Sequence, residues 1–124
     1  MTQTFTIPNK LPSMNDYQRA CRSHWSKGSR MKRETQDYVG WCIRAARLIP
    51  IASPVRINMH FFEPDRRRDL DNIASFASKV ILDALVQQGV LVDDSQQYVK
   101  GISYACSVDK GNPRVVVMIE EDLR

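Results

Sequence analysis

Residues 72–89, NIASFASKVILDALVQQG, carry the strongest fold signal in the chain. Apolar residues recur there at gaps that place them along one face of an amphipathic helix. The residues of this stripe are Ile73, Phe76, Ala77, Val80, Ile81, Ala84 and Leu85. Gly89 follows at a position where helices commonly end. The sequence therefore predicts a long helix from about residue 73 to Gly89, with one face in the core.

Strand patterns flank this helix. Residues 55–62 alternate between an apolar face and a more mixed one, which is typical of a strand with one buried side. After the helix come a short apolar stretch at 90–92 and two strand-like segments at 98–108 and 114–119. The Gly and Pro of the connecting DKGNP suit a turn. We expect these two segments to form a β-hairpin.

The N-terminal half supplies one more strand and one more helix. Residues 3–7 alternate as a short strand, and residues 8–30 are polar, basic and without a regular pattern. Residues 29–48 carry a second amphipathic stripe, which Pro50 and Pro54 end. The order βαβαβ followed by a hairpin predicts an α/β fold of the mixed α+β kind, with helices packed on a mixed sheet.

Size and composition limit the protein to one small domain. The chain has 124 residues and 43% hydrophobic content, enough for one core, so we assign residues 1–124 to a single domain. No stretch has the length and apolarity of a membrane span, and we expect a cytoplasmic protein that does not bind membranes. The three cysteines are far apart, which indicates reduced thiols.

The stretch PDRRRDLDN, residues 64–72, brings cations and carboxylates together just before the long helix. Asp69 and Asp71 lie on the same side of an extended backbone, and we expect Asp71 or Asn72 near the helix N-cap. Asp94, or with less support Asp93, follows the helix where the chain could return to the same edge of the sheet. Three carboxylates from two segments would suit Mg²⁺, which prefers oxygen ligands and activates water for attack on a phosphate. A solvated turn with a helix cap, and an acidic turn at 93–94, explain the same residues, so both interpretations stay open.

Basic residues near these carboxylates predict contact with a polyanion. Arg66, Arg67 and Arg68 could attract a phosphate backbone toward acidic groups that would otherwise repel it. The segment 13–33 adds Arg19, Arg22, Lys27, Arg30, Lys32 and Arg33 against a single acidic residue. Tyr17 and Trp25, within it, could stack on bases or pack under a loop. Lys79 could contact phosphate, or it could only pair with Asp83 one helical turn later.

The ordered set DRRRDLDN, KVILDAL and GVLVDD, with LPSMNDYQRACR before it and SVDKGNPRVVVMIE after it, resembles the RusA family of Holliday-junction resolvases. The resemblance covers most of the chain and makes residues 1–124 a RusA-like endonuclease domain. It implies a homodimeric, Mg²⁺-dependent endonuclease of bacterial or phage origin, with Mn²⁺ as a substitute ion. It also implies that Asp69, Asp71 and Asp94 bind the metal and act in catalysis, that Lys79 is the catalytic lysine, and that Asn72 supports them.

One departure from the family concerns the lysine. The best-known members have a shorter gap between the asparagine and the lysine. This chain has about one additional helical turn between Asn72 and Lys79, which places the lysine roughly 6 Å further along the helix axis. The resemblance predicts resolution of four-way junctions by paired nicks. Two other functions remain compatible with the residues: a branched-DNA-binding module that keeps the nuclease fold without catalysis, and a less selective nuclease that cuts flaps or other branches.

Overall fold

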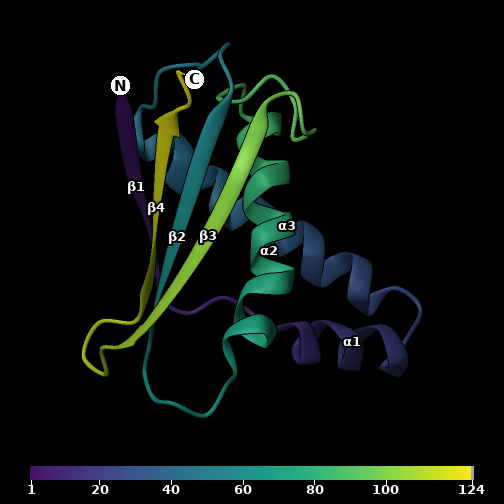
Figure 1. Cartoon of the computed structure of the whole chain (residues 1–124). Coiled ribbons are helices and arrows are strands. Elements are labelled where there is room, and N and C mark those ends of the chain that lie inside the picture. Colours follow the sequence, from purple (N-terminus) through teal and green to yellow (C-terminus); the bar gives the residue numbers. More distant parts are fainter. Residues whose placement is uncertain (124) are drawn as a thin grey trace.

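A computed structural model describes residues 1–123 as one mixed sheet with helices on one side (Figure 1). The elements in chain order are β1 (Thr2–Pro8), α1 (Met14–Ser23), α2 (Lys27–Ala46), β2 (Val55–Glu63), α3 (Leu70–Gln87), β3 (Val99–Val108) and β4 (Arg114–Glu121). The mixed α/β class predicted from the sequence is confirmed.

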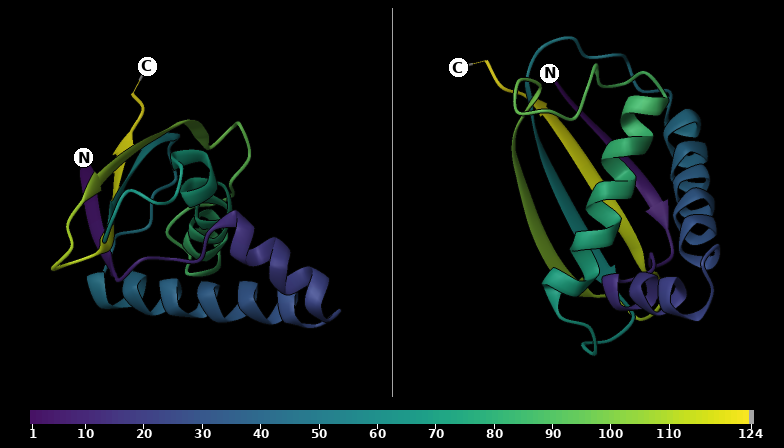
Figure 2. Two further views of the ribbon diagram at one scale, coloured as in Figure 1. Left: turned by 90° about the horizontal axis from the view of Figure 1, so that it is seen from below. Right: turned by 90° about the vertical axis from the view of Figure 1, so that its right-hand side faces the viewer.

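The sheet has the strand order β1-β4-β2-β3. Strands β2 and β3 are parallel and α3 crosses between them, whereas β4 is antiparallel to both of its neighbours, β1 and β2. Alternate residues of β2 enter the core, among them Ile57, Met59 and Phe61, while Arg56 on the opposite face is exposed. The three helices lie on one side of the sheet, and its other side is uncovered (Figure 2). This arrangement confirms the expected alternation of β2.

Helix α3 provides the centre of the core. All seven residues of the apolar stripe are buried, with Ala77, Val80, Ile81, Ala84 and Leu85 entirely inaccessible. Burial of each large aliphatic side chain contributes about 1.5–3 kcal/mol. Gly89 follows the helix with φ of +77°, a conformation that strains other residues. The helix therefore ends next to Gly89, as the sequence predicted. In the described residues, no helix is both long and apolar enough to span a bilayer, and the three cysteines are free thiols.

Helix α1 lies where the sequence predicted irregular chain. A reciprocal cap begins it: the Ser13 hydroxyl accepts from the Asp16 backbone N–H, and the Asp16 carboxylate accepts from the Ser13 N–H. None of its residues is fully buried. Met14 and Tyr17 are partly buried against the core, but an apolar face this short does not stand out among the basic residues around it, so hydrophobic periodicity did not reveal the helix.

Two predictions about strands are wrong: that residues 90–92 form the last strand of the βαβαβ order, and that residues 98–108 and 114–119 form a hairpin. Residues 90–92 form no strand and contribute only an isolated bridge between Leu91 and Ile51, because the N–H groups of Val90 and Leu91 bond back to the Leu85 carbonyl. Strands β3 and β4 form no hairpin, because β2 lies between them and pairs with both. The 109–113 turn therefore passes across the end of β2, where the Asp109 N–H bonds to the Glu63 carbonyl.

Candidate active site

The acidic pair lies at the N-terminus of α3. Asp69 is the N-cap residue, with extended backbone angles, and its side chain makes no capping hydrogen bond. Asp71 lies in the first turn, and its Oδ1 accepts the Asn72 N–H at 2.9 Å. Both carboxylates are exposed. The expected cap at Asp71 or Asn72 is therefore two to three residues too late, and the carboxylate of the actual cap residue, Asp69, makes no capping hydrogen bond.

Asn72 ties this end of α3 to α1. Its Oδ1 accepts the backbone N–H of Asn15 at 2.9 Å, a contact between residues 57 positions apart. Next to it, the Ser75 hydroxyl donates to the Asp71 carbonyl. These bonds orient the first turn of α3 against the N-terminal segment. The supporting role implied for Asn72 remains a prediction, and this geometry suits it.

Lys79 lies further along α3, and Asp94 follows that helix in the segment before β3. The Lys79 ammonium is 3.2 Å from Asp83 Oδ1 and 3.5 Å from Asp94 Oδ2. The hydrogen bond and negative charge of Asp83, with smaller contributions from Asp94, raise the pKa of Lys79 above its usual value. Lys32 of α2 also reaches Asp83, at 3.4 Å. Lys79 is therefore a permanent cation in an ion-pair network at the C-terminal half of α3.

The structure does not bring all three predicted carboxylates together within one chain. Asp71 and Asp83 are twelve residues apart on one helix, which corresponds to about 18 Å along the axis. Asp94 lies on the Asp83 side, because one ammonium contacts both. Among residues 1–123, no group of three His, Cys, Asp or Glu side chains is close enough to hold one metal ion. Asp69 and Asp71 are neighbours, and Asp94 is separate.

Arg68 has an internal position rather than the surface position expected of a DNA contact. Its Nε and Nη2 donate to the two carboxylate oxygens of Glu63 at 2.8 and 2.9 Å, and its Nη1 donates to the Leu11 carbonyl at 3.0 Å. Its Nη1 is also 3.7 Å from Asp16 Oδ2. The Glu63 side chain is 4% exposed and that of Arg68 15% exposed. Arg68 thus fixes the chain directly before Asp69. The sequence did not indicate a role for Glu63, because its pairing with Arg68 is evident only in the fold.

The other predicted cations lie on the surface around the helices. Arg66 and Arg67 are exposed in the loop that leads to Asp69, and the Arg67 guanidinium lies a long 3.7 Å from the Asp65 carboxylate. Arg19 and Arg22 are exposed on α1, and α2 presents Lys27, Arg30, Lys32 and Arg33 in its first turns. Lys32 alone of these four on α2 is half-buried. Positive charge therefore surrounds the α1–α2 corner and the loop before α3.

The two aromatic residues of the basic segment have different environments. Tyr17 stacks on Phe76 with ring centroids 4.7 Å apart, so it packs against the core. Trp25, in the turn between α1 and α2, is 86% exposed. Only Trp25 of this pair has a ring surface available to a base.

Exposed carboxylates at a helix N-terminus, next to a surface rich in arginine and lysine, are features of enzymes that act on a phosphate backbone. Comparison with protein families matches residues 2–120 to the family described as "Endodeoxyribonuclease RusA". The chain belongs to this family of nucleases.

Curated relatives agree with this assignment. The protein named "Crossover junction endodeoxyribonuclease RusA" from Escherichia coli (strain K12) is 39% identical over 99 residues, which are 77% of this chain and 76% of the relative. The protein of the same name from Shigella sonnei (strain Ss046) has the same identity and coverage. The resemblance found in the sequence is therefore confirmed.

Proposed function

We propose that this protein is a structure-selective endodeoxyribonuclease that resolves four-way DNA junctions by paired nicks. The observation that carries the proposal is the exposed pair Asp69 and Asp71, placed at the start of α3 with their charges available and with Arg66 and Arg67 next to them. The arginines attract the phosphate backbone, and the carboxylates lie where a cut phosphate would approach.

A divalent metal suits the donor set. Carboxylate oxygens are the ligands that Mg²⁺ and Mn²⁺ prefer, and Asp69 and Asp71 would hold the ion together with Asp94 of a second copy of the chain. When bound, such an ion lowers the pKa of a water and stabilises the negative charge of the attacked phosphate. The residues of the chain orient the backbone: Asn72 and Arg68 fix the turn that carries the acidic pair.

A second copy of the chain would complete the site. Asp94 lies beside the C-terminal half of α3, far from the acidic pair at the other end. If two copies are related by a two-fold axis that makes their α3 helices antiparallel, Asp94 of one copy comes close to Asp71 of the other. A four-way junction has approximate two-fold symmetry, and such a homodimer would present two sites to its two cut strands.

The surface cations hold the arms of the substrate in this proposal. Arg22, Arg30 and Arg33 are exposed on α1 and α2 and would contact phosphates, and Trp25 in the turn between these helices would stack on a base near the branch. We assign Arg68 a structural role, because its donors are directed to Glu63 and Leu11. Lys79 would act on the substrate only in exchange for its contact with Asp94.

A comparison of branched substrates tests the proposed function. Purified protein with Mg²⁺ is expected to cut a labelled synthetic four-way junction at symmetric positions in two strands, to cut flaps more weakly, and to leave linear duplex intact. Chelation of the metal is expected to stop cutting. Equal cutting of flaps and junctions would instead identify a less selective branch nuclease.

The location of Lys79, bound to Asp83 and Asp94 and away from the acidic pair, favours one other candidate: a branched-DNA-binding module without catalysis. This candidate predicts junction binding that is insensitive to metal and yields no product. The same assay therefore separates the two functions.

A further inference from the structure

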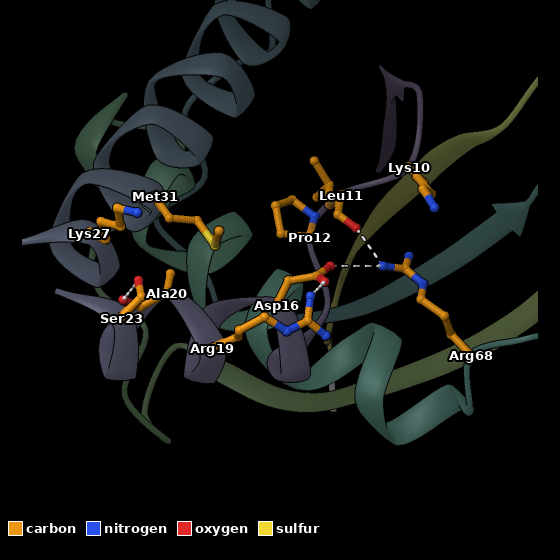
Figure 3. A pocket seen from close by; sticks show the side chains of 10 residues that line it. All are labelled: Lys10, Leu11, Pro12, Asp16, Arg19, Ala20, Ser23, Lys27, Met31 and Arg68. Carbon is orange, nitrogen blue, oxygen red and sulfur yellow. Dashed lines mark hydrogen bonds and ion pairs between the residues drawn. The ribbon is translucent and has the colours of Figure 1, made fainter.

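A cavity of about 630 Å³, widely open to solvent, lies between α1, the start of α2 and the segment before α1 (Figure 3). Leu11, Pro12 and Met31 supply apolar surface, and Lys10, Arg19 and Lys27 supply positive charge. Lys27 and Lys10 lie on opposite sides of it (Figure 3). Its size is within the roughly 300–1,000 Å³ typical of small-molecule pockets. The cavity therefore combines apolar walls with cations at both ends.

The charges favour an anion at the ends of the cavity. Within residues 1–123, neither Lys10 nor Lys27 forms an ion pair with a carboxylate. Arg19 is exposed and makes only a 3.7 Å contact with Asp16. A chain segment with a planar apolar group between two phosphates matches this pattern, and a nucleotide within a DNA strand has that composition.

Asp16 is the single acidic residue of the lining. The hydrogen bond from the Ser13 backbone lowers the pKa of Asp16, and Arg68 and Arg19 contribute in the same direction, so the group is a carboxylate at neutral pH. A carboxylate repels phosphate but accepts hydrogen bonds from the amino groups of bases. Its side chain is 39% exposed, which leaves acceptor positions available. The base, rather than a phosphate, belongs next to Asp16.

The cavity is adjacent to the acidic pair. Arg68, which lines it, directly precedes Asp69, and Asn15 of α1 bonds to Asn72 in the first turn of α3. We propose that the cavity binds one unpaired nucleotide of the branched DNA, close to the phosphate that is cut. This inference rests on the proposed function and adds a base-binding step to it.

Fluorescence of 2-aminopurine, placed singly at positions around the branch of a junction, tests this proposal in EDTA, where the strands stay intact. Transfer of the base from the stack into a cavity that has, within residues 1–123, no aromatic side chain in its lining should increase its emission severalfold at one position near the cut. Ala20→Phe, which fills the cavity, should abolish this increase. Gln18→Phe adds the same ring to α1 outside the cavity and should retain it.

Arg19→Ala provides a second test, which does not require the fold to accept a larger side chain at position 20. Arg19 is exposed, so its truncation should not disturb the fold. Loss of one phosphate contact should weaken junction binding by roughly five- to tenfold at 0.1 M salt. Arg44→Ala removes another exposed arginine, at the far end of α2, and should leave affinity unchanged.

Two failures are distinguishable. Wild-type protein that cuts the junction normally, but increases emission at no position near the branch, would overturn the nucleotide-binding role alone. Equal effects of Arg19→Ala and Arg44→Ala would also overturn it. Wild-type protein that neither binds nor cuts the junction would overturn the proposed function, and this inference with it.

Discussion

Replacement of Asp71 with Asn is expected to reduce cleavage of a four-way junction by about a thousandfold while junction binding is retained. Asn has nearly the same shape but lacks the negative charge that a divalent cation requires, and loss of several kcal/mol of metal-dependent stabilisation corresponds to this factor. Binding should persist or become tighter, because the change removes a charge that repels phosphate. Single-turnover cleavage and gel-shift titration on the same junction measure the two effects.

Asp65→Asn is the matched control for this prediction. Asp65 lies in the same loop, and its contacts are with the backbone and side chain of Arg67 rather than with the acidic pair. Its replacement should leave the cleavage rate within a few fold of the wild type. Similar losses in both variants would show that the loop as a whole, rather than the Asp71 carboxylate, limits the reaction.

Replacement of Glu63 with Ala is expected to lower the free energy of unfolding by about 3–5 kcal/mol. Glu63 is 3% exposed and accepts two hydrogen bonds from Arg68. Its removal leaves the Arg68 guanidinium with little access to solvent and without the carboxylate that accepts from both its Nε and its Nη2. The free energies of unfolding are obtained from urea titrations monitored by circular dichroism. The cleavage rate should fall as well, because Arg68 holds the chain before Asp69.

A double variant separates the ion pair from simple loss of packing. Glu63→Leu combined with Arg68→Met replaces both partners with apolar groups of similar size, and it should recover much of the lost stability. A double variant no more stable than Glu63→Ala would contradict the explanation by an unpaired buried charge. Glu63→Leu and Arg68→Met, measured singly, complete a double-mutant cycle. Its interaction term gives the coupling free energy between the two side chains.

The elements that bury a continuous apolar face were predictable from sequence. The stripe of α3 and the alternation of β2 are set by periodicity, and both lie in the core as expected. The apolar face of helix α1 is short, with Met14 and Tyr17 partly buried, so the cap formed by Ser13 and Asp16 was the clearer signal for this helix. The pairing of β3 and β4 was not predictable from their turn, because a turn fixes the direction of two strands but not whether a third strand lies between them.

The candidate site was predictable in its residue types but not in its geometry. The motif around Asp69 and Asp71 identifies the start of α3, and the structure places both carboxylates there. The sequence could not reveal that Asp94 contacts Lys79 at the other half of the helix, since this depends on the path of residues 88–98. Nor could it distinguish Arg68, which pairs with Glu63, from its exposed neighbours Arg66 and Arg67.

Subunit mixing tests the central claim most directly: that Asp71 of one copy and Asp94 of another hold the same metal. Asp71→Asn and Asp94→Asn should each be inactive alone. A mixed dimer would contain one site with both changes and one site with neither, so a mixture carrying differently tagged subunits should nick one strand of the junction. If purified mixed dimers form and bind the junction but make no nick, the two carboxylates do not act across copies, and the proposed site is wrong.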